Sequence, residues 1–538
     1  MKRRHVILRI TLCLLLFACA VTTRAADKWL KLSSEHFDML SCSSERDSKD
    51  LLVKLEQFRE FFFKTIPQGR IYDPRPLIFV FDSEKQYAPY SILTPDGKRR
   101  PGMGYYLSGL FLPRIMMINL DDRQALHTIF HEYTHALVRE RMGDHVPAWL
   151  NEGIAEVYET FTVNGDEVSC GKANAYHATM MQRGPLIPMG TLFAVTHRSS
   201  YYNESEKMSM FYAQSWLLVH HAMFGAQPGK YDFKGLLHFA DKATIPGAVT
   251  ADAFAAVFGA NYKDLEYKLQ EYLRSGRHLA RTAKIPAKPI RAKITVRPAT
   301  DAEREIELAG MRWRAKNSPD IEFVLLDLVK KYPDNPRVYE ILAELKMYDG
   351  DPRGARDYLR KAVERQSTTP LAHVWLLRNY YSESRLPRGY IMPQDMDVEY
   401  THLVDRALEL APDCMEAYEM LAIIESQRAS IRGKKVNEAI KALSDMPDPG
   451  KTLLAVATVY WRLKKYNAAE VAIARLMQNP KSSYDLKSSA HDLLCVIAKE
   501  TGKPPPKPLP APPQTGGGSP FPIQISPLNV PMPPVKRR

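Results

Sequence analysis

The chain has few cysteines and no long apolar run after its first 25 residues, and most of its length carries little net charge. Only four cysteines lie beyond residue 25, and none has the close spacing of a structural metal site: Cys42, Cys170, Cys414 and Cys495. Two of these cysteines lie in each half of the chain, so one disulfide in each half is possible, although the spacing does not establish the pairing. No later segment is apolar enough to span a bilayer, which excludes a transmembrane helix in the mature chain.

The formal net charge of +13 comes from the ends of the chain and one internal segment. These segments carry five, seven and five basic residues and no acidic ones: Met1–Ala25, Arg277–Pro298 and Lys503–Arg538. Without them the net charge is −4. A basic groove on a folded domain is therefore not expected, and nucleic acid is excluded as a partner.

Residues 1–25 have the pattern of a secretory signal peptide. Basic residues precede the apolar run Leu12–Ala18, and Thr23–Ala25 ends on small residues suited to cleavage. Leu16–Cys19 is also close to a lipoprotein signal, so a lipid anchor at Cys19 is an alternative. Both interpretations predict an exported protein, periplasmic or extracellular.

At 538 residues the chain is too long for one hydrophobic core, so we predict two ordered domains. The first, residues 26–276, is predicted to be an α+β domain with a small mixed sheet. The patterns indicate strands at Glu35–Leu40, Leu77–Phe81 and Ile115–Leu120. They indicate helices at Asp47–Lys64 and in four segments from Phe211 to Ser275. If Ile115–Leu120 is a sheet edge, it can bind an extended peptide by strand addition; an ordinary sheet strand is the alternative.

Residues 301–500 are predicted to form an all-α domain of helical repeats. Pro333, Tyr339 and Leu342 of one unit recur as Pro412, Tyr418 and Leu421 in a later unit, at the same offsets. This pattern resembles degenerate tetratricopeptide (TPR) repeats, which implies a protein partner on this domain.

Two further segments have compositions typical of connectors. Residues 277–300 are basic and contain three prolines, so we predict a linker or an extended strap. Residues 501–538 are rich in proline and are predicted to be a disordered tail.

The segment that is most informative about function is His131-Glu132-Tyr133-Thr134-His135, in a predicted helix over residues 122–141. His131 and His135 are four residues apart and project from one helix face, where two imidazole nitrogens can bind one ion. Glu132 lies between them. A carboxylate there can accept a proton from a metal-activated water, which metal-assisted hydrolysis requires.

A second predicted helix begins at Pro147 and contains Glu152 and Glu156. Because the intervening loop is short, Glu152 is expected to approach the two histidines. Two solvent-facing carboxylates on an amphipathic helix are the alternative. His145 is a weaker candidate for a third ligand, and the extended metzincin motif is absent from the helix that follows His135.

These motifs resemble the gluzincin clan of zinc metallopeptidases, especially the bacterial peptidase MA-like domains. The resemblance extends from about Phe37 to Leu273 and includes the segment Phe211–Trp216. It implies a zincin-like fold and a bound Zn²⁺. The implied ligands and general base are His131, His135, Glu152 and Glu132.

The same resemblance implies roles for residues around the metal. Glu156 matches an acidic residue that orients a ligand histidine, although some gluzincins have Asp there. Tyr212 is the implied oxyanion stabiliser, with a packed aromatic side chain as its alternative. Tyr201, Tyr202 and His220 are weaker candidates for that role.

The predicted function is that of an exported zinc-dependent metallopeptidase acting on a peptide or protein substrate. The alternative is a cell-envelope binding protein, in which an inactive peptidase-like domain is fused to a TPR scaffold. The complete set of ligand and base residues favours the enzyme.

Overall fold

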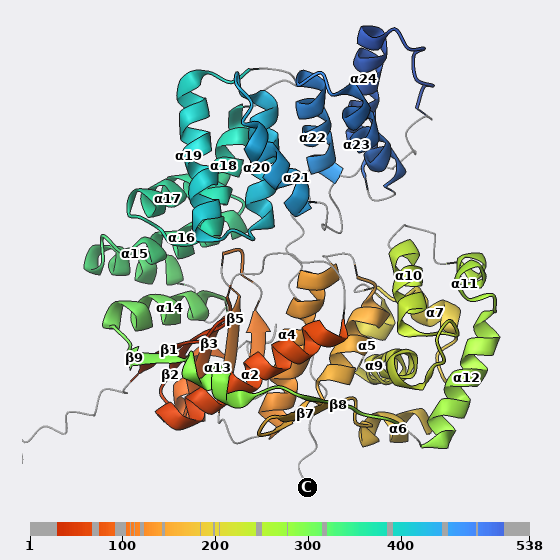
Figure 1. Cartoon of the computed structure of the whole chain (residues 1–538). Coiled ribbons are helices and arrows are strands. Elements are labelled where there is room, and N and C mark those ends of the chain that lie inside the picture. The colour runs from red at the N-terminus through yellow and green to blue at the C-terminus, as the bar shows by residue number, and fades with distance from the viewer. Residues whose placement is uncertain are drawn as a thin grey trace, which may run out of the picture.

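The computed structural model of the chain is mostly helical and, in the residues that it describes, contains two sheets (Figure 1). It describes residues 29–66, 75–91, 104–107, 109–111, 113–118, 123–142, 146–182, 184–196, 199–203, 205–243, 250–276, 278–314, 320–384, 391–443, 450–479 and 482–509. The predicted signal segment with Cys19, and the tail from residue 510 onward, lie outside these ranges. Among the helices in the described ranges, none is both long and apolar enough to cross a bilayer.

Among the described residues, a six-stranded mixed sheet forms the base of the first domain, in agreement with the α+β prediction. Its strands, in order across the sheet, are β4 (Gly104–Leu107), β5 (Arg114–Ile118), β3 (Leu77–Phe81), β2 (Asp38–Ser41), β1 (Leu30–Ser33) and β9 (Thr295–Pro298). β2, β3 and β5 are parallel, whereas β1, β4 and β9 run antiparallel to their neighbours. β3 is buried along its whole length, as its unbroken apolar sequence predicts for a central parallel strand.

The strand predicted at Ile115–Leu120 is present as β5, but it does not lie at the sheet edge. β5 pairs with β3 on one side and with β4 on the other, so its backbone groups already have partners. The edge-strand interpretation is therefore wrong for β5. β5 is not an edge strand because β4, which ends a stretch rich in proline, glycine and lysine, pairs with it and forms this edge of the sheet among the described residues.

Residues 277–300, predicted to be a linker or strap, contribute to both sheets. β9 pairs with β1, and β8 adds a third strand to a second, antiparallel sheet. The second sheet consists of β6 (Thr162–Asn164), β7 (Glu167–Cys170) and β8 (Arg281–Lys284). Between β8 and β9, α13 (Ala287–Ala292) packs against the first domain. Ile285 and Ile294 are buried and anchor this basic segment.

Three helices of the first domain carry the candidate site: α4 (Arg123–Met142), α5 (Ala148–Tyr158) and α9 (Ser205–His220). α5 packs against both α4 and α9. A further helix, α2 (Glu45–Thr65), crosses the sheet beside α4 (Figure 1). The rings of Phe58 and Phe130 stack between α2 and α4 with their centroids 4.6 Å apart. This aromatic contact fixes α4 against the sheet layer.

The remaining helices complete the first domain. They are α3 (Glu84–Tyr87), η1 (Ala88–Tyr90), α6 (Ala175–Gln182), α7 (Met189–Phe193), α8 (Ser200–Asn203), η2 (His221–Gly225), α10 (Phe233–Ala243), α11 (Ala251–Phe258) and α12 (Tyr262–Ser275). The four helices predicted between Phe211 and Ser275 are therefore present, and the first of them begins earlier, at Ser205.

Gly153 lets α5 and α9 approach closely. A Cβ atom added there would lie 2.5 Å from the carbonyl oxygen of Ser215 and 2.5 Å from Cγ2 of Val219. Because the carbonyl belongs to helical backbone, Gly153→Ala must push the two helices apart, and we expect it to destabilise the fold by about 1–3 kcal/mol. Urea denaturation measures this loss. Gly433→Ala is the control, because its added Cβ meets nothing within 4 Å, and equal stability of the two variants would contradict the prediction.

The second domain is an array of packed helices (Figure 1). Its members are α14 (Asp301–Arg314), α15 (Ile321–Lys331), α16 (Pro336–Tyr348), α17 (Pro352–Glu364), α18 (Pro370–Ser384), α19 (Gln394–Leu410), α20 (Met415–Gln427), α21 (Gly433–Leu443), α22 (Gly450–Arg462), α23 (Tyr466–Gln478) and α24 (Tyr484–Thr501). Consecutive helices contact each other, most extensively α16 with α17 and α22 with α23.

Two units of the array repeat the same side-chain contact. The hydroxyl of Tyr339 donates to the carbonyl oxygen of Pro333 at 2.8 Å, and that of Tyr418 donates to the carbonyl oxygen of Pro412 at 3.0 Å. Both bonds span six residues and fix the start of a helix against the preceding turn. The predicted TPR-like repeat is thus confirmed as recurring helix pairs.

The two domains share buried side chains. Met311 of α14 packs in the cluster formed by the sheet residues Phe79 and Phe81, and Phe111, which precedes β5, packs in the core of the array. Arg114 of β5 is fully buried between the domains. Its guanidinium nitrogens lie 3.7 Å from a carboxylate oxygen of Glu307 and 3.7 Å from one of Glu344. The array is therefore docked on the sheet.

All four cysteines beyond residue 25 are free thiols, so neither disulfide left open by the sequence is formed. The thiol of Cys42 donates to the carbonyl oxygen of Val80, and that of Cys170 donates to the carbonyl oxygen of Val157. Burial raises the pKa of the Cys170 thiol well above its ordinary value, which keeps it protonated.

Candidate metal site

His131 and His135 project from one face of α4 and converge on Glu152 of α5. The Nε2 atoms of His131 and His135 lie 3.5 Å and 3.6 Å from the same Glu152 oxygen, Oε2. All three side chains are buried, and Glu152 is 0% exposed. The helical spacing and the short α4–α5 connection thus bring together the three predicted ligands, and Glu152 does not face solvent.

The spacing of these atoms suits a tetrahedral metal ion. Zinc bonds to nitrogen and oxygen of about 2.0–2.1 Å place neighbouring ligand atoms about 3.3 Å apart. The two separations from Glu152 are close to that value, and one ligand atom from each residue lies within 4.8 Å of the others. Two imidazoles and one carboxylate also form a donor set that leaves a fourth position open.

The tautomer of His135 fits the same role. Its Nδ1 lies 3.0 Å from Oδ1 of Asn151, an oxygen that can only accept, so Nδ1 carries the hydrogen. Nε2 is then a buried acceptor, and it has no hydrogen-bond partner among the described residues. Such an atom is costly to bury unless something binds it, and a cation would do so.

The charges around His131 also favour a cation. Burial alone would lower the pKa of this imidazole, but hydrogen bonds with Glu152 and Glu159 outweigh burial and raise the pKa well above its ordinary value. The charges of Glu156 and Glu132 act in the same direction. Because several carboxylates surround the two imidazoles, a divalent metal supplies the positive charge that this environment stabilises.

Glu156 lies where the resemblance implies an orienting residue. Its Oε1 is 3.7 Å from Nδ1 of His131, and its side chain is buried. Glu159, which sequence reasoning missed, is closer, with Oε2 3.5 Å from the same nitrogen. Glu159 is the residue directly after α5, three positions beyond Glu156, and this helical spacing was the available signal.

Two more residues of the surroundings were missed. Asn151, next to Glu152, bonds to His135 as described above. His177 of α6 bonds to Glu156, with 2.5 Å between its Nε2 and Oε2 of the carboxylate. Nothing in the spacing of the sequence indicates His177, because α6 reaches the site only through the tertiary fold.

The predicted general base and oxyanion stabiliser both lie near His131. Glu132 is half-buried on α4 and acts electrostatically on His131. Tyr212 of α9 is 7% exposed, and its ring centroid lies 6.4 Å from that of His131. Of the weaker candidates, His145 and the side chain of Tyr202 lie outside the described residues, and Tyr201 is half-buried on α8.

His220, a weaker oxyanion candidate, is instead a packed core residue. Its Nδ1 lies 2.9 Å from the hydroxyl oxygen of Tyr272, and its Nε2 lies 2.6 Å from the carbonyl oxygen of Gly171. The side chain is 0% exposed, and burial lowers its pKa to about 4. Both ring nitrogens are occupied, which leaves none for a substrate.

The lowered pKa of His220 predicts a pH-dependent loss of stability. In the unfolded chain His220 takes up a proton below about pH 6.5, whereas the folded chain resists protonation until about pH 4. Its contribution is therefore fully present above pH 6.5 and falls by about 2 kcal/mol by pH 5. Urea denaturation at pH 7.5 and 5.0 should show a smaller decrease for His220→Gln than for the wild type. An equal decrease would contradict this assignment.

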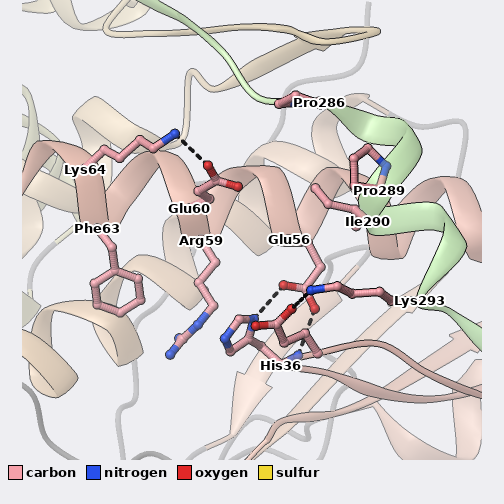
Figure 2. Close-up of a pocket in the computed structure, with 11 residues that line it drawn as sticks. His36, Glu56, Arg59, Glu60, Phe63, Lys64, Pro286, Pro289, Ile290 and Lys293 are labelled. Atoms are coloured by element: carbon pink, nitrogen blue, oxygen red, sulfur yellow. Dashed lines mark hydrogen bonds and ion pairs between the residues drawn. The ribbon is translucent and has the colours of Figure 1, made fainter.

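A separate pocket of about 530 Å³ lies between α2, α13 and the turn before β2 (Figure 2). In it Glu56 accepts bonds from the backbone N–H of His36 and from its ring, at 2.8 and 2.7 Å. None of the predicted metal ligands lines this pocket. Arg59 lines it and also bonds to Tyr133 and Glu140, on the side of α4 opposite the two histidines.

No family model and no curated protein matches the chain. Solved structures give partial likenesses. PilF of Pseudomonas aeruginosa is 17% identical over 37% of this chain and 84% of its own, with a TM-score of 0.26. A thermophilic TPR protein of Thermus thermophilus is 13% identical over 36% of this chain and 98% of its own, with a TM-score of 0.23. Yeast Tom70 is 13% identical over 86% of this chain and 77% of its own, also with a TM-score of 0.23. TM-scores this low do not establish a shared fold with any of these structures.

Proposed function

We propose that this protein is a zinc-dependent peptide hydrolase of gluzincin type. The observation that carries the proposal is the convergence of His131, His135 and Glu152 on one buried point, with Nε2 of His135 available to a ligand. A structural ion pair alone would not need two imidazoles and a fully buried carboxylate at tetrahedral spacing. A zinc ion there would polarise a substrate carbonyl and lower the pKa of a coordinated water.

Glu132 and Tyr212 supply the proton transfers and the charge stabilisation in this proposal. Glu132 follows His131 on α4 and accepts the proton of the attacking water, then delivers it to the departing amine. Tyr212 donates a hydrogen bond to the oxygen on which negative charge develops. Its ring lies beside His131, from a helix that packs on α5. In this proposal α4 contributes the base and two ligands, α5 contributes the third ligand, and α9 contributes the oxyanion stabiliser.

An extended substrate would bind along β4. In the described part of the sheet, β4 forms one edge and β9 the other, and α4 packs against β4. A peptide added to β4 by main-chain hydrogen bonds would therefore run beside the helix that carries both histidines. This places strand addition on Gly104–Leu107 rather than on β5.

The alternative function is an envelope scaffold without catalysis. It is favoured by large apolar side chains that the array exposes: Phe323, Val398 and Val471 are 72%, 64% and 62% exposed. Exposed apolar side chains suit a protein partner. Both functions include export to the periplasm or the cell exterior through the signal segment 1–25, with a lipid anchor at Cys19 as the alternative.

Peptide-library digestion separates the two functions. The purified chain is loaded with zinc, incubated with a peptide library and assayed by mass spectrometry, with zinc-free chain and His135→Ala as controls. We expect new peptide termini only for the zinc-loaded wild type. Zinc binding without any cleavage would favour the scaffold, and a wild type that binds no zinc would refute the metal assignment.

A further inference from the structure

We propose that His177 is a positioning residue of the metal site, acting through Glu156 on the ligand His131. The inference rests on the proposed zinc site and extends it to α6, which contributes no metal ligand. Asn174, immediately before α6, plays a parallel and weaker part through Glu159.

Two carboxylates face the Nδ1 atom of His131, and each is bound on its other oxygen by the same short segment. Glu156 presents Oε1 to Nδ1 of His131 at 3.7 Å, while its Oε2 lies 2.5 Å from Nε2 of His177. Glu159 presents Oε2 at 3.5 Å, while its Oε1 accepts from Nδ2 of Asn174 at 3.0 Å. Residues 174–177 therefore restrain both carboxylates.

The restraint matters because a glutamate side chain has three rotatable bonds. A carboxylate orients an imidazole only if its own position is fixed, and a free glutamate would lose rotamer entropy with every bond it makes. When Nδ1 of His131 donates to a fixed carboxylate, the ring plane is set and Nε2 is left as the ligand atom. His177 supplies this fixation for Glu156.

The burial of His177 indicates that its role is more than packing. The side chain is buried near Trp216, with ring centroids 6.0 Å apart, and its Nδ1 has no hydrogen-bond partner among the described residues. An apolar side chain would fill this place without leaving a polar nitrogen unsatisfied. The bond to Glu156 is what the histidine adds.

A second metal ion among His131, Glu156 and Glu159 is a competing interpretation, because these residues also bring ligand atoms within 4.8 Å. We favour the hydrogen-bonded arrangement because the outer oxygen of each carboxylate already bonds to His177 or Asn174. A second ion would in addition require His131 to lose its Nδ1 hydrogen. The proposal therefore implies one zinc per chain.

Zinc affinity, measured by competition with a chromophoric chelator, tests the proposal on the full chain. We expect His177→Ala to weaken zinc binding about 10–100-fold. His177→Gln, whose amide can still donate to Glu156, should recover most of the affinity. Asn174→Ala should weaken binding less. His220→Gln is the matched control, since it alters another buried histidine that bonds to Gly171 and Tyr272.

The combination with Glu156→Gln shows whether His177 acts through that carboxylate. If it does, adding His177→Ala to Glu156→Gln weakens zinc binding little further. A His177→Ala chain that melts earlier but binds zinc with wild-type affinity would overturn the proposal, because the role would then be structural only. Two zinc ions per chain would also overturn it. A wild type that binds no zinc would refute the proposed function itself.

Discussion

Replacing Glu132 by glutamine is expected to lower the rate of peptide hydrolysis by about 10²–10⁴-fold while zinc remains bound. Glutamine has nearly the same shape but cannot accept a proton from the attacking water. Glu132 is not among the residues whose atoms converge on the proposed metal position, so its loss should leave zinc affinity close to that of the wild type. Initial rates with a cleaved library peptide, and zinc content of the same samples, measure both effects.

The matched control for this variant is Glu45→Gln, which also neutralises a glutamate but on the exposed start of α2. It should retain wild-type rates. Glu132→Asp should fall between the two, because the carboxylate is kept but moved back by one methylene. Full activity of Glu132→Gln would remove Glu132 from the mechanism. Loss of zinc together with activity would make it a structural or ligand residue instead.

Replacing Arg114 by alanine is expected to destabilise the protein by about 3–5 kcal/mol. The arginine is 0% exposed, and its removal leaves the carboxylates of Glu307 and Glu344 buried with less compensating charge. Glu307 keeps Arg337, at 2.5 Å, and Glu344 keeps the backbone N–H of Leu110, at 2.7 Å. The expected loss of unfolding free energy arises at the junction of the two domains, where Arg114 lies, and urea denaturation measures it.

Arg406→Ala provides the comparison, because Arg406 pairs with Glu409 on the surface of α19 at 3.0 Å. Such an exposed pair contributes at most about 1 kcal/mol. Combining Arg114→Met with Glu344→Gln should recover part of the stability lost in Arg114→Ala, since it removes one buried charge and fills the space. Equal stability of Arg114→Ala and Arg406→Ala would show that the array is not held to the sheet by this ion cluster.

The inner part of the candidate site could be predicted because it depends on local geometry. Helical periodicity puts His131 and His135 on one face, and a short connection forces the helix of Glu152 against them. The residues that surround these ligands could not be predicted in the same way. His177 bonds to Glu156 from a helix that follows a β-hairpin, and its contact depends on how α6 packs against α9.

In the fold as well, contacts between residues close in the sequence could be predicted, whereas contacts between distant residues could not. The repeat of Tyr339 and Tyr418 predicted the helix pairs, because each contact spans six residues. Composition misrepresented residues 277–300: basic residues and prolines are typical of a linker, yet short strands there complete two sheets. Their hydrogen bonds join backbone groups and are therefore independent of side-chain charge.

The docking of the array on the sheet was likewise absent from the sequence patterns. Phe111 and Met311 look like ordinary apolar residues, and only the tertiary fold shows that each enters the core of the other domain. Arg114 follows a proline at the start of a strand, where a basic residue would ordinarily face solvent. Contacts between residues far apart in the chain have no periodicity that could indicate them.

The central claim is that His131, His135 and Glu152 bind a catalytic metal ion with one position left open. Zinc X-ray absorption spectroscopy on the purified, zinc-loaded chain tests this most directly. We predict one zinc per chain, bound by two imidazoles and by oxygen ligands at about 2.0–2.1 Å, with this signal lost in His135→Ala. A chain without stoichiometric zinc, or a zinc spectrum that is unchanged in His135→Ala, would contradict the account.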